Sequence, residues 1–412
     1  MLGAAPRIGV FDKSPWYLSA QVREAGGEPV PLVLPGRRPH AGVALVREWA
    51  ADLAQVSCSQ EHLDALLIAA GEPEELAGLV LSALRLNLPT VVAPPRDACL
   101  FATLAALGLA PLAANPSEVV MEVAGSGEPR PLELIEDFSL ANALRATYSL
   151  GDGPETIVHL SAIAREAGVL GFDQILRVLL PDTPMLAEPG SDWFDEHGVA
   201  GLLAHLDEAI HDTQSVEGRL REALPPPPPA PAPAADSRLV FVQGRTSGTE
   251  ALCRASGEEE VSGACRVFDS EPEAARAVEA DNVAAGELLV VNGCGPRGGP
   301  GLLRLDLLAQ RLRERGLEDS VAVVTDGLPS EAARGTSVSL VSPEAAAGGV
   351  IGRLRDGDTL RIDLSEGRIR TGVRADEIER RAAYESPDPA GSGYAARYAR
   401  SALPALEGAG FG

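Results

Sequence analysis

A run of prolines divides the chain and limits what can fold on either side of it. Residues 225–235 read PPPPPAPAPAA. Proline lacks a backbone N–H, so this stretch cannot continue a helix or pair within a sheet. We interpret residues 224–235 as a polyproline II linker between a domain over residues 1–223 and a second over residues 236–412. Limited proteolysis is expected to cleave between about Ala223 and Arg238 and to leave two stable fragments.

Before the linker, the apolar pattern is mostly helical. Amphipathic helices are predicted at 43–56, 76–86 and 199–210. Short β-type runs at 7–11, 65–70 and 90–93 alternate with helical segments. Strands that alternate with helices form parallel sheets, so the N-terminal region is predicted to be an α/β domain with flanking helices.

After the linker, β-type runs dominate and glycine turns separate them. These runs are 239–243, 266–268, 288–291, 321–325, 337–341 and 359–364. Few helices are expected between them. The pattern predicts a β-rich barrel or sandwich.

Three glycine-rich turns follow apolar runs between residues 289 and 349: LVVNGCGPRGGPG, VAVVTDGLPSEAARG and VSLVSPEAAAGG. Glycines in the first turn can adopt positive φ and bring N–H groups close to an anion. Two arginines nearby would add guanidinium charge. The turns therefore predict a binding site for a small carboxylate or phosphate. The residues assigned to it are Gly295, Arg297, Gly298, Gly299, Asp326, Gly327 and Arg334.

In order and spacing these turns resemble the C-terminal half of the dihydroxy-acid/phosphogluconate dehydratase family, which carries GP-x-GGPG, TDG-x-x-S and SPEAA-x-GG. The likeness continues through 354–364 and 393–400, and more loosely through 23–30, 63–89, 104–109 and 151–168. The resemblance implies a β-barrel C-terminal domain and a homodimer. It also implies an ancestral activity, the dehydration of hydroxy or sugar acids with an iron–sulfur cluster and a magnesium ion.

The family's three cluster cysteines have poor counterparts in this sequence. The resemblance places Glu72 at one of them and Trp16 at another. Cys99 lies too close to 104–109 to replace the third. No close cysteine pair offers ligand spacing elsewhere, so the cluster is predicted to be absent.

Two residues are candidates for catalysis. Ser330 matches the family serine that acts as a base, although Leu328-Pro329 and Glu331 depart from the family pattern around it. A serine without an adjacent cation is a weak base, and the alternative is a turn serine that hydrogen-bonds its own backbone. Cys294 stands where many family members have a magnesium-binding glutamate. A thiol is a poor magnesium ligand, and the alternative is a buried small apolar residue.

A cluster of acidic residues could form a binding site for a divalent metal ion. Glu72, Glu74 and Glu75 could hold a hard cation if Asp12 or Glu155 converged on them. The alternative is a solvated helix start, because the helix dipole favours carboxylates there. No metal ligand is assigned.

Charge narrows the range of partners. The formal net charge of −24 argues against nucleic acid and anionic membranes. No apolar run has transmembrane length, and few cysteines among 412 residues favour the cytoplasm.

Two functions remain open. One is a non-catalytic partner or regulatory subunit, either a homodimer or a protein associated with a related dehydratase. The other is a repurposed, cluster-free carbon–oxygen lyase of the hydro-lyase type, which acts on a small hydroxy or amino acid in a specialised biosynthetic pathway.

Overall fold

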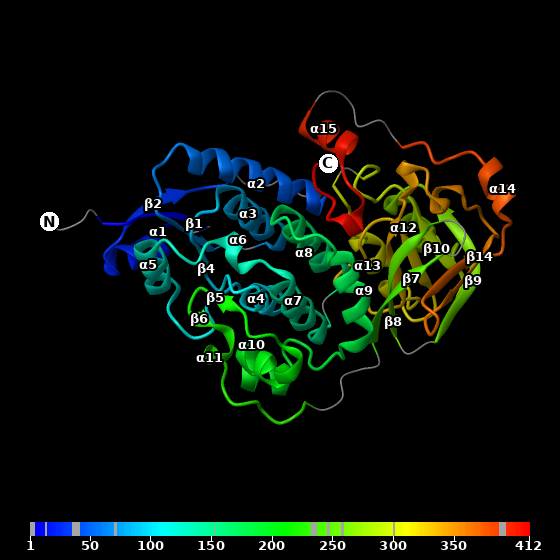
Figure 1. Cartoon of the computed structure of the whole chain (residues 1–412). Helices are drawn as coiled ribbons and strands as arrows, with labels where there is room; N and C mark the ends of the chain where they lie inside the picture. Colours follow the sequence, from blue (N-terminus) through cyan, green and yellow to red (C-terminus); the bar gives the residue numbers. More distant parts are fainter. Residues whose placement is uncertain are drawn as a thin grey trace. The chain divides into compact units, whose positions relative to one another are not determined.

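The computed structural model describes residues 5–12, 15–34, 42–69, 72–151, 153–231, 237–244, 248–256, 259–299, 301–386 and 393–412. The chain forms two compact units (Figure 1). The N-terminal unit comprises Met1–Arg37, Val46–Asp152 and His159–Ala234, and the C-terminal unit comprises Arg38–Leu45, Gly153–Val158 and Ala235–Gly412. The sequence did not predict that two short early segments group with the second unit. The predicted linker lies partly outside the described residues, and its role as a domain boundary stays a prediction.

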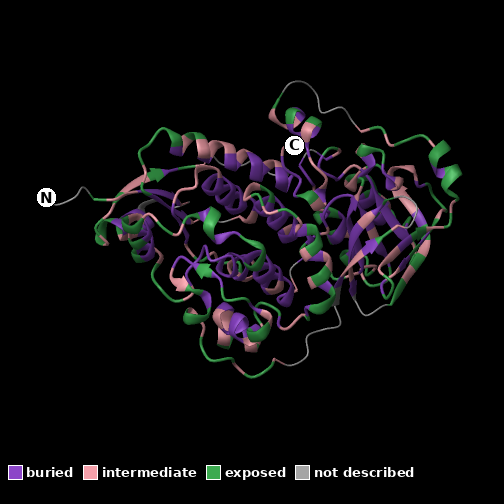
Figure 2. Ribbon diagram, in the orientation of Figure 1, coloured by how far each residue is buried: buried purple, intermediate pink, exposed green. Residues whose placement is uncertain are grey.

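A four-stranded parallel sheet forms the centre of the N-terminal unit, with the order β2-β1-β3-β4. Its strands are β1 (Arg7–Asp12), β2 (Glu28–Leu32), β3 (Ala65–Ala69) and β4 (Thr90–Val92). The apolar residues of β1 and β3 are buried (Figure 2). Burial on both faces explains their continuous apolar runs. The predicted parallel sheet is confirmed.

Helices make up most of the rest of this unit, although the first residues of the helices at 43–59 and 154–166 group with the C-terminal unit. They are α1 (Pro15–Glu24), α2 (Val43–Ser59), α3 (Pro73–Leu86), α4 (Ala98–Ala106), α5 (Pro116–Ser126), α6 (Pro131–Leu134), α7 (Asp137–Ser149), α8 (Pro154–Glu166), α9 (Phe172–Asp182), α10 (Asp192–Leu206) and α11 (Leu220–Ala223), with a short hairpin of β5 (Gln214–Ser215) and β6 (Gly218–Arg219). The ends of α3 follow local signals: Pro73 occupies its first turn, and Asn87 ends it in the left-handed conformation. The three helices predicted from apolar periodicity correspond to α2, α3 and α10.

The C-terminal unit contains a closed eight-stranded barrel with the order β10-β11-β12-β8-β7-β14-β13-β9. Its strands are β7 (Ser237–Gln243), β8 (Glu250–Ser256), β9 (Glu260–Phe268), β10 (Leu288–Val291), β11 (Ala322–Thr325), β12 (Ser337–Ser342), β13 (Thr359–Asp363) and β14 (Arg368–Thr371). Its helices are α12 (Glu271–Glu279), α13 (Asp306–Glu314), α14 (Ala375–Arg380) and α15 (Tyr394–Ser401). The β-rich prediction is confirmed, and the barrel is the form it takes.

One side of the barrel is built from parallel strands. Strands β9, β10, β11 and β12 pair in parallel, and α12 and α13 lie in the connections between them. Leu288 and Val290 of β10 belong to the barrel core, whereas Leu289 and Val291 pack with α12 and α13 residues. The carboxyl ends of parallel strands meet at one edge of a sheet. The turns after β10, β11 and β12 therefore meet at the same end of the barrel.

Candidate functional site

Asp326 joins the three glycine-rich turns. Its buried carboxylate follows β11 and accepts hydrogen bonds from the N–H groups of Gly293 (3.3 Å), Cys294 (2.8 Å) and Ala345 (2.9 Å). Gly293 and Cys294 follow β10, and Ala345 follows β12. Burial raises the pKa of the Asp326 carboxyl, while these backbone donors partly oppose the shift. Asp326 thus acts as a shared hydrogen-bond acceptor that ties the turns together.

The side chain of Glu344, which follows β12, likewise accepts hydrogen bonds from the turn after β10. Its carboxylate accepts the N–H groups of Arg297 and Gly298, each at 3.1 Å. Gly295 must lack a side chain, because a Cβ there would lie 2.3 Å from Glu344 Oε2. These two turn amides therefore already bind a carboxylate that belongs to the chain itself.

The expected role of the turn glycines needs correction. Positive φ occurs at Gly293 (72°) and Gly301 (98°), but Gly295, Gly298 and Gly299 do not adopt it. Close packing explains the last three instead. A Cβ at Gly299 would lie 2.8 Å from the Gly293 carbonyl oxygen, and one at Gly298 would lie 3.0 Å from Gly293 Cα. The turn is shaped by contacts within the protein as well as by glycine's backbone freedom.

Gly327 is constrained in a similar way. A Cβ there would lie 2.5 Å from Cys294 Cβ, and its N–H donates to Thr325 Oγ1. The turns after β10 and β11 are therefore in direct contact. The sequence predicted that they would be neighbours, and the structure brings them together.

The two arginines assigned to the site have different neighbours. Arg297 Nε donates to the Ala402 carbonyl at 3.0 Å. Arg334 is exposed, and its backbone N–H donates to the Glu318 carboxylate at 2.9 Å. Neither contact is with a common anion. The expectation that the two arginines bind one anion together stays a prediction.

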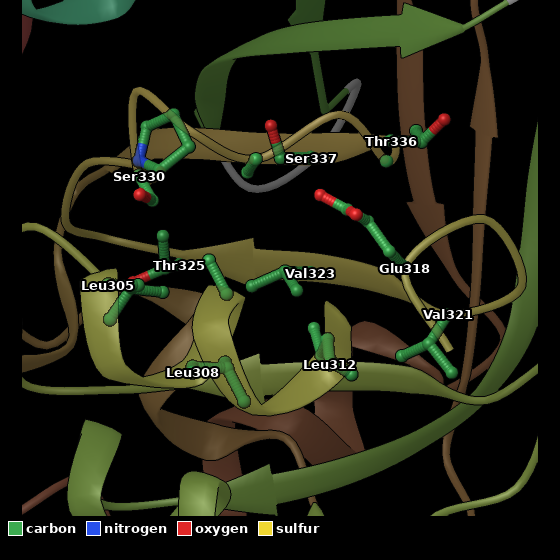
Figure 3. A pocket seen from close by; sticks show the side chains of 14 residues that line it. Leu305, Leu308, Leu312, Glu318, Val321, Val323, Thr325, Ser330, Thr336 and Ser337 are labelled. Atoms are coloured by element: carbon green, nitrogen blue, oxygen red, sulfur yellow. The ribbon is translucent and has the colours of Figure 1, made fainter. Parts of the chain in front are cut away.

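Ser330 lies at the edge of a small cavity (Figure 3). Its side chain is buried, and its Oγ accepts the Ala332 N–H at 3.3 Å, which is the contact of a serine turn. Leu305, Leu308 and Leu312 of the α13 segment form an apolar wall, and the hydroxyl of Ser337 and the carboxylate of Glu318 line the same cavity. Sequence analysis missed Glu318 and Ser337, because their distances from Ser330 along the chain give no motif.

An arginine that the sequence analysis overlooked lies close to the segment after Ser330. Within the C-terminal unit, Arg304 forms an ion pair with Glu155, with Nε 2.5 Å from Oε2, and lies 3.6 Å from Glu331. Glu155 was considered as a metal ligand, and the structure instead gives it this cation. The Arg304 guanidinium thus lies beside two carboxylates.

The environment of Cys294 suppresses its reactivity. The side chain is buried, with Sγ 3.7 Å from the Asn292 carbonyl oxygen. Burial raises the pKa of the Cys294 thiol well above its usual range, and the nearby Asp326 charge adds to the shift. The thiolate that would act as a nucleophile is therefore disfavoured.

The acidic residues near Glu72 begin α3 but are not a solvated helix start. Glu74 and Glu75 lie in its first turn and are buried. Within the described ranges, no group of three or more His, Cys, Asp or Glu side chains has an arrangement that could hold a metal ion.

The thiols of the chain do not fit an iron–sulfur cluster. Cys253 and Cys265 lie inside the barrel core, and Cys58 and Cys294 are also buried. Cys99 is partly buried on α4. A cluster needs several thiolates at one point, and among the described residues no such group of three or more possible ligands occurs. Ser14, and the side chains of Pro15 and Trp16, lie outside what the structure describes.

A pH-dependent contribution to stability follows from Glu344. Burial raises the pKa of its carboxyl to about 7, with the Asp326 charge adding to the shift and the Gly298 and Arg297 N–H groups opposing it. Between its usual pKa and about 7, the folded protein holds a proton that the unfolded chain releases. Stability from this group should therefore fall by about 3 kcal/mol as pH rises through that window.

Urea unfolding of the wild type and Glu344→Gln at pH 5 and pH 8 tests this expectation. Glutamine can keep one oxygen at the Oε2 position, where it still accepts the Arg297 and Gly298 N–H groups. The variant should show a smaller loss of stability at pH 8. Equal pH dependence in the two proteins would contradict the assignment.

No helix in the described part of the chain is long and apolar enough to cross a membrane.

Comparison with known proteins adds to this geometry. The chain belongs to the class of proteins that combine an α/β unit with a β-barrel unit. In the barrel unit, hydrogen bonds connect three glycine-rich turns. The family described as "Dihydroxy-acid/6-phosphogluconate dehydratase C-terminal" matches residues 229–409. The chain belongs to the dihydroxy-acid/6-phosphogluconate dehydratase family.

Curated relatives agree with this assignment. The chain is 34% identical over 305 residues to the dihydroxy-acid dehydratase of Citrifermentans bemidjiense. The aligned region covers 68% of this chain and 55% of that protein. It is 33% identical over 328 residues to dihydroxy-acid dehydratase 2 of Bordetella bronchiseptica, covering 72% and 56%. The chain thus spans about half the length of the curated relatives it matches.

Proposed function

We propose that this chain is a dehydratase-family protein without cluster-dependent catalysis, and that it serves as a non-catalytic partner or regulatory subunit. The observation that carries the proposal is the start of α3. Glu72 stands there at the position where the resemblance places a cluster thiolate, and it precedes the buried Glu74 and Glu75. Iron–sulfur clusters are held by thiolates, and carboxylates are hard ligands that suit other ions.

Two candidate catalytic groups give further support. Ser330 accepts a hydrogen bond from its own turn, and Arg304 pairs with Glu155 and Glu331. A serine needs a strong base or a metal close by to remove a proton from a substrate. The raised pKa of Cys294 leaves its thiol protonated near neutral pH.

The partner is proposed to be a second copy of this chain or a related dehydratase. Membership of a family of dehydratases supports this choice, because a retained fold can keep a subunit contact after chemistry is lost. A small carboxylate or phosphate would then act as a regulatory ligand. The cytoplasm remains the expected location.

Anaerobic purification with metal and sulfide analysis tests the proposal. We expect no stoichiometric iron or sulfide and no dehydration of dihydroxy acids. A parallel co-purification with a related dehydratase from the same cell should recover a complex. Bound iron and sulfide, together with turnover of a dihydroxy acid, would overturn the proposal.

The cavity beside Ser330 favours a second candidate, a cluster-free lyase for a small hydroxy or amino acid. Ser337, whose Oγ is buried without a hydrogen-bond partner within the described residues, lines this cavity with Glu318. Thermal melting of the same preparation with hydroxy acids, amino acids and phosphorylated acids tests this candidate, with Arg334→Ala for comparison. Thermal stabilisation that depends on Arg334 and is accompanied by turnover would favour the lyase. If no compound raises the melting temperature, the role as a non-catalytic subunit is the one supported.

A further inference from the structure

A bend in α10 brings together aromatic rings that are distant along the helix. Gly198 has φ 60° and ψ −164°, a conformation that is essentially restricted to glycine. Trp193 and His205 are separated by 12 positions, which is about 18 Å along a straight helix. Their ring centroids are instead 5.8 Å apart, with the planes at 78°. The bend therefore creates a cluster that a regular helix could not form.

A third ring completes this cluster. His197 lies 5.1 Å from Trp193, edge to face. Gly201 makes room for it, because a Cβ at that position would lie 2.5 Å from His197 Cβ. We call Trp193, His197 and His205 the α10 aromatic cluster. Two glycines with separate structural roles support it.

The proline segment after α11 contacts this cluster directly. Trp193 Nε1 donates a hydrogen bond to the Pro229 carbonyl at 2.7 Å. His205 Nδ1 lies 3.2 Å from the preceding carbonyl, that of Pro228. The side chain of Pro228 also lies close to Gly201, with its Cγ 3.7 Å from the Cβ position. Two consecutive carbonyls are thus contacted by two side chains of one bent helix.

This chemistry is suited to a polyproline II strand. Such a strand has no internal hydrogen bonds, so its carbonyls are left for donors outside it. Indole N–H is a donor without acceptor capacity, and aromatic surfaces pack well against proline rings. Aromatic-lined grooves recognise proline-rich ligands by this combination. Most of Pro225–Pro229 remains exposed on its other side, so the contact is confined to the surface.

We propose that the α10 aromatic cluster is a binding site for an extended proline-rich segment, occupied by the chain's own Pro228 and Pro229. The linker is then a docked strap rather than a free spacer. Because the strap is tethered beside its site, its effective concentration is on the order of millimolar, which excludes weak proline-rich ligands in solution.

Freeing the site tests the proposal. Replacing Pro225–Pro229 by a glycine–serine stretch of equal length should leave the cluster open to a synthetic PPPPPAPAPAA peptide. The chain has three tryptophans, so the indole N–H resonance of Trp193 can be assigned with Trp193→Phe. Peptide should shift this resonance in the linker variant and leave it unchanged in the wild type. A linker variant that ignores millimolar peptide would overturn the proposal.

Proteolysis provides a second measurement on the intact chain. Trp193→Phe keeps an aromatic ring but removes the donor to Pro229. Loss of one hydrogen bond should raise the undocked population about fivefold, and elastase cleavage between residues 223 and 236 should accelerate accordingly. Gly198→Ala should act in the same direction, because nothing lies within 4 Å of its Cβ position and only the bend is disturbed. Trp49→Phe on α2 is the matched control and should not change the rate. Equal rates in all four proteins would contradict a docked strap.

Discussion

Gly349→Ala should lower the free energy of unfolding of the C-terminal unit by roughly 3 kcal/mol. A Cβ at this position would lie 1.8 Å from the Pro343 carbonyl oxygen and 2.6 Å from its carbonyl carbon. Both are backbone atoms, so no side-chain rotation can relieve the overlap. The φ of Gly349 is −57°, which any residue can adopt, and the cost is therefore steric. The turn after β12 would have to shift and would disturb the Glu344 and Asp326 contacts.

Urea unfolding followed by far-ultraviolet circular dichroism measures this loss. All three tryptophans precede the linker, so their fluorescence should report the N-terminal unit and change little. Gly393→Ala is the matched control, because its φ is −66° and no atom lies within 4 Å of its Cβ position. It should stay within about 0.5 kcal/mol of the wild type. Equal effects of the two variants would mean that close packing is not the reason for Gly349.

Asp326→Ala should destabilise the same unit by roughly 4 kcal/mol. The substitution leaves the N–H groups of Gly293, Cys294 and Ala345 without their acceptor in a buried setting. An unsatisfied buried donor costs about 1–3 kcal/mol. The loss of stability in Asp326→Asn should be intermediate. Asparagine keeps one oxygen acceptor, but its side-chain N–H₂ would face a backbone N–H that now donates to the second oxygen.

Asp363→Ala is the control for this series. Its carboxylate accepts the Glu366 N–H at 2.9 Å and the Ser365 hydroxyl at 2.8 Å, both in an exposed turn. We expect a loss of about 1 kcal/mol from denaturant unfolding. If Asp326→Ala costs no more than this control, Asp326 is not the group that holds the turns together.

These expectations change how the glycine turns bear on function. In the sequence, intact GPRGGPG and TDG turns favour a retained ligand site over a pure scaffold. In the structure, Asp326 and Glu344 bind the turn amides, and Gly295 and Gly327 allow the close contacts. These internal contacts are a structural role for the turns, and the predicted ligand site remains to be tested. The support that the turns lend to a repurposed enzyme is correspondingly weaker, and the cavity beside Ser330 becomes its main argument.

Many strands and helices could be predicted from the sequence, because an element that is buried on one or both faces has a recognisable pattern of apolar residues. The runs that predicted β7 and β9 to β13 are rich in apolar residues, and several of them end in glycine turns. Strands β8 (EALCRAS) and β14 (RIRT) were not predicted. Helices α12 and α13 were not predicted individually, although their apolar residues pack against β10 and its neighbours.

The sequence by itself predicted the α/β and β-rich classes, the family and two neighbouring glycine turns, because periodicity, turn glycines and motif order are local properties. Tertiary structure decided which groups accept hydrogen bonds from the turn amides. Asp326 and Glu344 reach the amides only when β10, β11 and β12 lie side by side. It also decided that Gly198 brings Trp193 to His205 and the proline strap. Such contacts join residues far apart along the chain, and no local spacing encodes them.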